Sequence, residues 1–138
     1  MFWSKKVKLV QESIVQAERC KLDAEKLYRS GKYNCAEAVV ETIRNHFVPD
    51  IPEAVVGTVS GFGGGSGTGC ICGAVSGGTV ALGLVQQDKV STSRSTRELH
   101  SWFKEKYGVT CCKTIRQTHK GICPVLTGEV AGKIAELI

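Results

Sequence analysis

The feature that most constrains this chain is residues 54–87, a stretch without Asp, Glu, Lys, Arg or His. It holds most of the 16 glycines, and a glycine-dense turn at residues 61–69 leads into an apolar run that ends at Val85. Glycine permits backbone dihedrals and close approaches that other residues resist. Cys70 and Cys72 lie where the turn passes into this run. The stretch therefore predicts a buried central helix with sulfur chemistry sheltered at its start.

The composition is typical of a globular protein, with 42% hydrophobic and 22% charged residues in a chain of 138. That length predicts one domain. Basic residues are scattered rather than interleaved with aromatics, so no nucleic-acid partner is expected. The apolar run is too short to span a membrane, and no secretory signal follows Met1. A cytoplasmic location is expected, where thiols stay reduced, so the seven cysteines indicate metal binding or redox chemistry.

Apolar residues at three- and four-residue steps predict an all-α fold. We expect a single-domain bundle of about six helices, in which the glycine-rich loop leads into the buried central helix. An N-terminal amphipathic helix is predicted within residues 1–30, and the cysteine-bearing region covers residues 31–138. The further helices are predicted at residues 34–47, 52–59, 73–85, 93–106 and from 124 to the C-terminus, with a short helix or turn at 110–116.

Two helix starts carry specific capping predictions. Asn34 is predicted to cap the second helix, and Glu37 stands three residues on, as in a variant capping box. Ser93 or Ser95 is predicted to cap the helix that ends near Lys106.

Cysteines fall at or near four predicted helix starts. They are Cys35, Cys72, Cys112 and Cys123, with Cys111 as an alternative to Cys112. Free N–H groups and the helix dipole at such positions favour a thiolate. If the helix starts converge, the pocket would stabilise thiolates or an anionic cluster bound by them. Packing remains an alternative for Cys35, and the roles of Cys20 and Cys70 stay open.

Several sharper motifs are absent. There is no Cys-x-x-Cys, which removes support for a thioredoxin-like dithiol or a zinc ribbon, and no Cys-x-x-Cys-His for covalent haem. The glycines fit neither a Gly-x-Gly-x-x-Gly register nor a P-loop, so nucleotide binding is not expected. Of the histidines, His119 is better placed for a metal role than His100, because it lies between two cysteines.

A set of ordered motifs carries a family resemblance. The set comprises Asn34-Cys35-Ala36-Glu37-Ala38-Val39, Gly61-Phe62-Gly63-Gly64-Gly65, Cys72-Gly73-Ala74-Val75-Ser76-Gly77, Cys112 and Cys123-Pro124. From about Gly31 to the C-terminus the chain resembles the bacterial C-GCAxxG-C-C family of redox-active proteins. The resemblance implies four signature cysteines, namely Cys35, Cys72, Cys112 and Cys123. It also implies a distant similarity to the iron–sulfur part of split-Soret cytochromes, without their haem.

The leading hypothesis is a redox protein whose four signature cysteines bind an iron–sulfur cluster of the two-iron type for electron transfer. One alternative is a metal-free thiol–disulfide protein, with Cys72 as the nucleophile and Cys35 as a further reactive thiol. Others are a structural zinc site in a scaffold protein and thiols that merely pack. Because its helix start favours ionisation, Cys72 is predicted to be more acidic than Cys20.

Enzymatic activity and the redox partner are left open. The resemblance implies a membrane transporter as an associated protein, and a homodimer is a further alternative.

Overall fold

The computed structural model describes residues 2–138, with side chains from residue 4 onward, so Met1 of the predicted first helix lies outside the described part. The all-α prediction is confirmed. Seven α-helices form in the described chain, one more than expected because the predicted short helix or turn near residue 115 is a helix. They are α1 (Phe2–Arg29), α2 (Cys35–Phe47), α3 (Ala54–Gly57), α4 (Gly73–Gln86), α5 (Lys89–Tyr107), α6 (Cys112–Thr118) and α7 (Cys123–Leu137).

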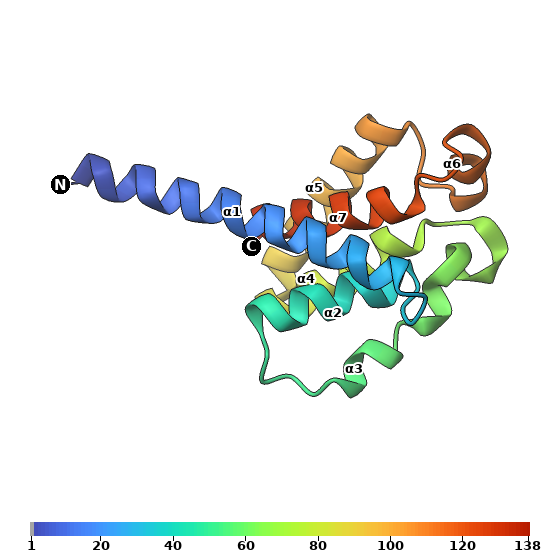
Figure 1. Ribbon diagram of the computed structural model, residues 1–138, viewed down its shortest axis with the longest axis horizontal. Helices are drawn as coiled ribbons and strands as arrows, with labels where there is room; N and C mark the ends of the chain where they lie inside the picture. Colours follow the sequence, from blue (N-terminus) through green and yellow to red (C-terminus); the bar gives the residue numbers. More distant parts are fainter. Residues whose placement is uncertain (1) are drawn as a thin grey trace.

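Helices α1 and α7 run side by side in opposite directions (Figure 1). Two glycines of α7 allow this contact. A Cβ on Gly128 would lie 2.6 Å from the carbonyl oxygen of Lys21, and one on Gly132 would lie 3.3 Å from that of Ala17. The N-terminal half of α1 extends beyond the body of the molecule, and its apolar side chains there, Val7, Leu9, Val10 and Ile14, are exposed.

The predicted central helix is α4, and its small residues bring neighbouring helices close. A Cβ on Gly77 would lie 2.7 Å from the Cα and the carbonyl oxygen of Ala36 in α2. A Cβ on Gly78 would lie 2.8 Å from Ile134 of α7 and 3.1 Å from Leu99 of α5. Glycine is weak in a helix interior. Here its small size lets α4 pack between α2 on one side and α5 with α7 on the other.

The start of α2 confirms the predicted capping box. The Asn34 side chain accepts a hydrogen bond from the Glu37 amide at 3.0 Å, and the Glu37 carboxylate accepts one from the Asn34 amide at 3.0 Å. The Asn34 side-chain amide also donates to the carbonyl oxygen of Ser60 at 2.8 Å. This second contact fixes the loop that follows α3 against the start of α2.

Two predicted helix boundaries are wrong. Helix α5 begins at Lys89, because Asp88 rather than Ser93 or Ser95 is its N-cap and accepts a hydrogen bond from the Ser91 amide at 2.8 Å. Gln87 ends α4 in the left-handed conformation, so the connection is two residues long. The helix predicted at 52–59 is shorter, covering only α3, and is followed by a 3-10 turn at Ser60–Phe62.

Helices α2, α4 and α7 begin at the same end of the molecule, where α6 and the glycine-rich loop also lie (Figure 1). The loop includes a π-type turn at Gly65–Gly69 with several positive φ angles. This end therefore carries the four helix starts at which the sequence places cysteines. Within residues 2–138, no helix has the combination of length and apolar character that crossing a membrane requires.

Candidate functional site

Backbone pairing brings two cysteine segments together. The segment before α4 and the segment before α6 form a short antiparallel contact centred on Ile71 and Cys111. The Cys72 amide donates to the Thr110 carbonyl at 2.8 Å, and the Cys112 amide donates to the Cys70 carbonyl at 3.3 Å. These hydrogen bonds fix Cys72, the N-cap of α4, beside the first turn of α6.

Cys35 approaches the same place from α2. A Cβ on Gly73 would lie 2.5 Å from the Cys35 Sγ and 2.6 Å from the Phe62 carbonyl oxygen. The Cys35 sulfur thus packs directly against the backbone of the residue that follows Cys72. Only glycine at position 73 leaves room for it.

Cys112 and Cys123 complete the group. A Cβ on Gly65 would lie 2.8 Å from the Cys112 Cβ, and Gly65 has a φ of +66°, which favours glycine. The charge of Cys123 affects the ionisation of both Cys35 and Cys112. The structure therefore brings the four thiols predicted at helix starts near enough to influence one another electrostatically.

The sequence reasoning did not identify Tyr28 as part of this site. Burial raises the pKa of its hydroxyl, and so do the negative charges that Cys123 and Cys35 would carry. Tyr28 lies four residues after Ala24, which is one of the buried residues of α1 together with Ala17 and Cys20. That periodicity was the available signal that Tyr28 faces the body of the protein.

Burial dominates the ionisation of these thiols. It raises the pKa of Cys72 to about 12. The charge of Cys35 also raises this pKa, whereas the backbone amides of Ala74 and Val75 lower it. The pKa of Cys35 is also raised, first by burial, while the amides of Gly64 and Ala36 favour its thiolate. Although no Cys72 side-chain cap hydrogen bond forms, the nearby amides still act electrostatically. The helix starts thus stabilise the thiolates without overcoming their desolvation.

The remaining cysteines differ in their surroundings. Cys20 is fully buried in α1, where burial and the charge of Asp23 raise its pKa to about 12. Cys70 is exposed. Cys111 donates a hydrogen bond to the Gly69 carbonyl at 3.2 Å, and its pKa is lowered by hydrogen bonds from the Thr114 hydroxyl and amide. All seven thiols are free, and Cys111 is distinct from the more buried Cys35 and Cys72.

The prediction that Cys72 is more acidic than Cys20 is wrong for this state of the protein, because burial raises the pKa of both thiols to about 12. At pH 8 such a pKa leaves only about one thiol in 10,000 ionised. We expect single-cysteine variants that retain Cys72 or Cys20 to be alkylated at least about 100-fold more slowly than one that retains the exposed Cys70. The measurement uses reduced, metal-free protein, with folding checked by circular dichroism. A Cys72 rate within a few-fold of the Cys70 rate would contradict this assignment.

In residues 2–138, no three His, Cys, Asp or Glu side chains are arranged around a common point that could hold one metal ion. His119 contacts the Thr118 hydroxyl and the Tyr107 ring, and His100 contacts the Thr96 carbonyl. The side chains of the described residues therefore form no preformed metal site, whether for a single zinc ion or for a cluster.

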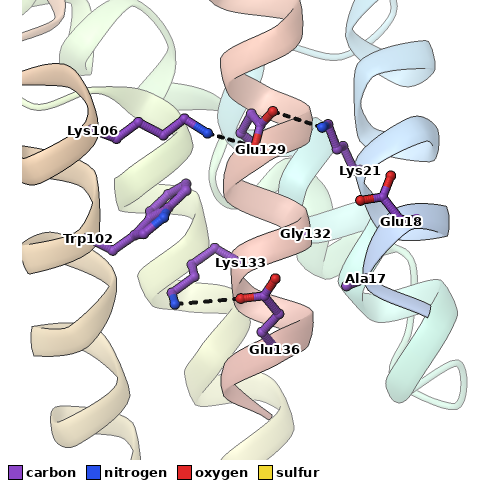
Figure 2. Close-up of a pocket in the computed structure, with 9 residues that line it drawn as sticks. All are labelled: Ala17, Glu18, Lys21, Trp102, Lys106, Glu129, Gly132, Lys133 and Glu136. Carbon is purple, nitrogen blue, oxygen red and sulfur yellow. Dashed lines mark hydrogen bonds and ion pairs between the residues drawn. The ribbon is translucent and has the colours of Figure 1, made fainter. Parts of the chain in front are cut away.

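A separate groove of about 250 Å³ lies between α1, α5 and α7 (Figure 2). None of the cysteines lines it. Glu129 forms ion pairs with Lys21 and Lys106, both at 2.9 Å, and Lys106 lies over the Trp102 ring. Because its charged side chains are largely paired with one another, this groove is better explained as a contact between helices than as the functional site.

The comparisons with known proteins agree with the cysteine pattern. The family model described as "Putative redox-active protein (C_GCAxxG_C_C)" matches residues 33–137. The chain belongs to this family, and the family's description names no cofactor. No curated protein and no solved structure matches the chain.

Proposed function

We propose that Cys35, Cys72, Cys112 and Cys123 form one electron-transfer centre that holds an iron–sulfur cluster of the two-iron type. The observation that carries the proposal is the gathering of these thiols at the starts of α2, α4, α6 and α7, with Cys35 packed against Gly73 and the Cys72 segment hydrogen-bonded to the Cys112 segment. Four cysteine thiolates are the usual ligands of such a cluster, which supplies one-electron transfer when bound.

The residues present fit this group in their chemistry. Gly65 and Gly73 leave the space that a Cβ would take from Cys112 and Cys35. Amides of Gly64 and Ala36 face the Cys35 sulfur, and those of Ala74 and Val75 face Cys72. Hydrogen bonds to ligand sulfurs and burial are the features by which a protein tunes such a centre. Cys111 remains the alternative ligand to Cys112.

In this proposal the chain itself performs three tasks. The four thiols would lose their protons when the cluster binds, and coordination to the metal would offset the cost of forming thiolates in a buried site. The backbone amides then stabilise the negative charge on sulfur. Burial of Cys72, which is 6% exposed, excludes water from the inner side of the centre.

A metal-free dithiol is the second candidate function, and the position of Cys35 favours it. Its sulfur packs against Gly73, the neighbour of Cys72. The two thiols would together give up two electrons and two protons to a small oxidised disulfide, which would leave as two thiols while a Cys35–Cys72 bond forms. No iron would be needed for this reaction.

A matched pair of substitutions tests the centre. Cys72→Ser should abolish bound iron and visible absorbance after anaerobic purification, because it removes one of the four ligands. Cys20→Ser is the control, since Cys20 is equally buried and its pKa is likewise about 12, but it lies in α1 outside the proposed centre.

We expect Cys20→Ser to retain the iron content of the unmodified protein. Iron retained in full by a folded Cys72→Ser protein would contradict the proposed ligand set. The dithiol candidate would instead be supported by two results together. The parent protein would contain no iron but would lose free thiols on oxidation, and the Cys72→Ser protein would no longer show that loss.

A further inference from the structure

A cavity of about 370 Å³ opens beside the proposed centre, between the glycine-rich loop and α6. Cys112 forms part of its wall, together with Gly64, Thr68, Gly69, Lys113, Arg116 and Gln117. Its volume is in the range of small-molecule sites, about 300–1,000 Å³. This is the cavity through which a small molecule could reach one of the four thiols.

The charges around this cavity have one sign. Lys113 and Arg116 are exposed, and neither forms an ion pair with a carboxylate in the described residues. No carboxylate lines the cavity. The spacing of three residues puts both cations on one face of α6.

The sequence explains why no acid compensates these cations. Residues 106–128, which include α6, contain no Asp or Glu, and residues 54–87 contain no charged residue. These two segments supply all the residues that line the cavity. The groove in Figure 2 is the opposite case, because its lysines are paired with Glu129 and Glu136. The cavity at Cys112 therefore retains a positive potential that can attract and orient an anion.

We infer that this cavity binds a small anionic redox partner, one that carries carboxylate or phosphate groups, with Lys113 and Arg116 holding the anionic group beside Cys112. The redox part of this inference rests on the proposed function of the centre. The binding part does not, since it depends only on the shape and charge of the cavity. Arg116 suits this role because its guanidinium presents a planar set of donors that matches carboxylate and phosphate oxygens.

The first test is equilibrium binding of citrate and of inorganic phosphate to the full chain as purified. Calorimetry at low ionic strength measures the binding. The two probes distinguish a carboxylate from a phosphate ligand. The double variant Lys113→Gln/Arg116→Gln should weaken binding of the preferred anion about tenfold or more. The matched control, Lys89→Gln/Arg97→Gln, also removes one lysine and one arginine charge, but from exposed positions of α5. It should change the dissociation constant for the anion less than about twofold.

The second test couples the cavity to electron transfer. The rate of electron transfer from the reduced protein is measured with the anionic acceptor hexacyanoferrate(III) and with the cationic hexaamminecobalt(III), one electron passing to each acceptor. Each rate is compared between variant and parent, because the two acceptors differ in intrinsic reactivity. The Lys113→Gln/Arg116→Gln protein should lose at least about tenfold in the rate with the anion and none with the cation. Equal losses in the α5 control would show a general charge effect and would overturn the inference.

The two proposals fail in different ways. Iron and sulfide are measured on the same samples that are used for binding. A protein that contains iron but binds neither citrate nor phosphate overturns the cavity inference alone. A protein that binds one of these anions at the cavity but shows neither iron nor thiol oxidation retains the site and overturns the redox centre.

Discussion

Replacing Gly73 with alanine should damage both the stability of the protein and its cysteine site. The new Cβ would lie 2.5 Å from the Cys35 sulfur and 2.6 Å from the Phe62 carbonyl oxygen. The carbonyl belongs to the backbone and has little freedom to move, so α4 or the Ser60–Phe62 turn must shift. We expect a loss of about 1–3 kcal/mol in the free energy of unfolding, in the range for overpacked sites. Denaturant unfolding measures this loss, and iron analysis of the same sample measures the effect on the site.

Gly83→Ala is the matched control because it adds the same methyl group to the same helix. There the nearest atom to the new Cβ would be the Thr92 Cγ2 at 3.8 Å, an ordinary contact. Alanine is the better helix former by up to about 1 kcal/mol, so this variant should be neutral or more stable. Equal stability of the Gly73→Ala and Gly83→Ala proteins, with iron content unchanged, would show that α4 does not pack tightly against Cys35.

Replacing Arg44 with methionine should cause the largest loss of stability, about 3–5 kcal/mol, because it leaves a buried carboxylate without its partner. Glu41 and Arg44 pair at 2.7 Å, and their side chains are only 5% and 11% exposed. Arg44 also donates to the Ile51 carbonyl at 3.0 Å, which holds the loop after α2. Denaturant unfolding of the variant and its parent measures the difference.

Arg29→Met provides the control for a charge removed from an ion pair on a helix. Arg29 pairs with Glu25 at 3.0 Å, but its side chain is 56% exposed. Such surface pairs contribute about 0–1 kcal/mol. A loss for Arg44→Met no greater than that for Arg29→Met would mean that the Glu41 carboxylate is solvated when its partner is removed.

Local sequence signals predicted the helices well. The apolar periodicity that predicts α1 and the Asn34–Glu37 capping box both depend on residues near one another in the chain, and the structure confirms each. The Asp88 cap was missed because Ser93 and Ser95, about one and a half and two turns later, are also residue types that favour an N-cap. The buried Glu41–Arg44 ion pair was missed because Arg44 is held by the carbonyls of Pro49 and Ile51, which lie beyond the end of α2.

The candidate site was harder to predict because it depends on long-range contacts. The helix starts identified Cys35, Cys72, Cys112 and Cys123 as candidates, but only the pairing of residues 70–72 with 110–112 brings two of their segments together. The ionisation of Cys72 was predicted in the wrong direction, because a sequence displays the helix start but not the depth of burial. The unpaired cations beside Cys112 were likewise visible only once α6 and the glycine-rich loop faced the same cavity.

The most direct test of the central claim is analysis of iron and acid-labile sulfide, with a visible spectrum, on the full chain purified without oxygen. A two-iron cluster on the four thiols predicts about two iron atoms and two sulfides per chain, together with a brown colour that air or a chelator removes. A colourless protein without iron or sulfide, both as purified and after anaerobic reconstitution with iron and sulfide, would contradict the account of Cys35, Cys72, Cys112 and Cys123 as cluster ligands.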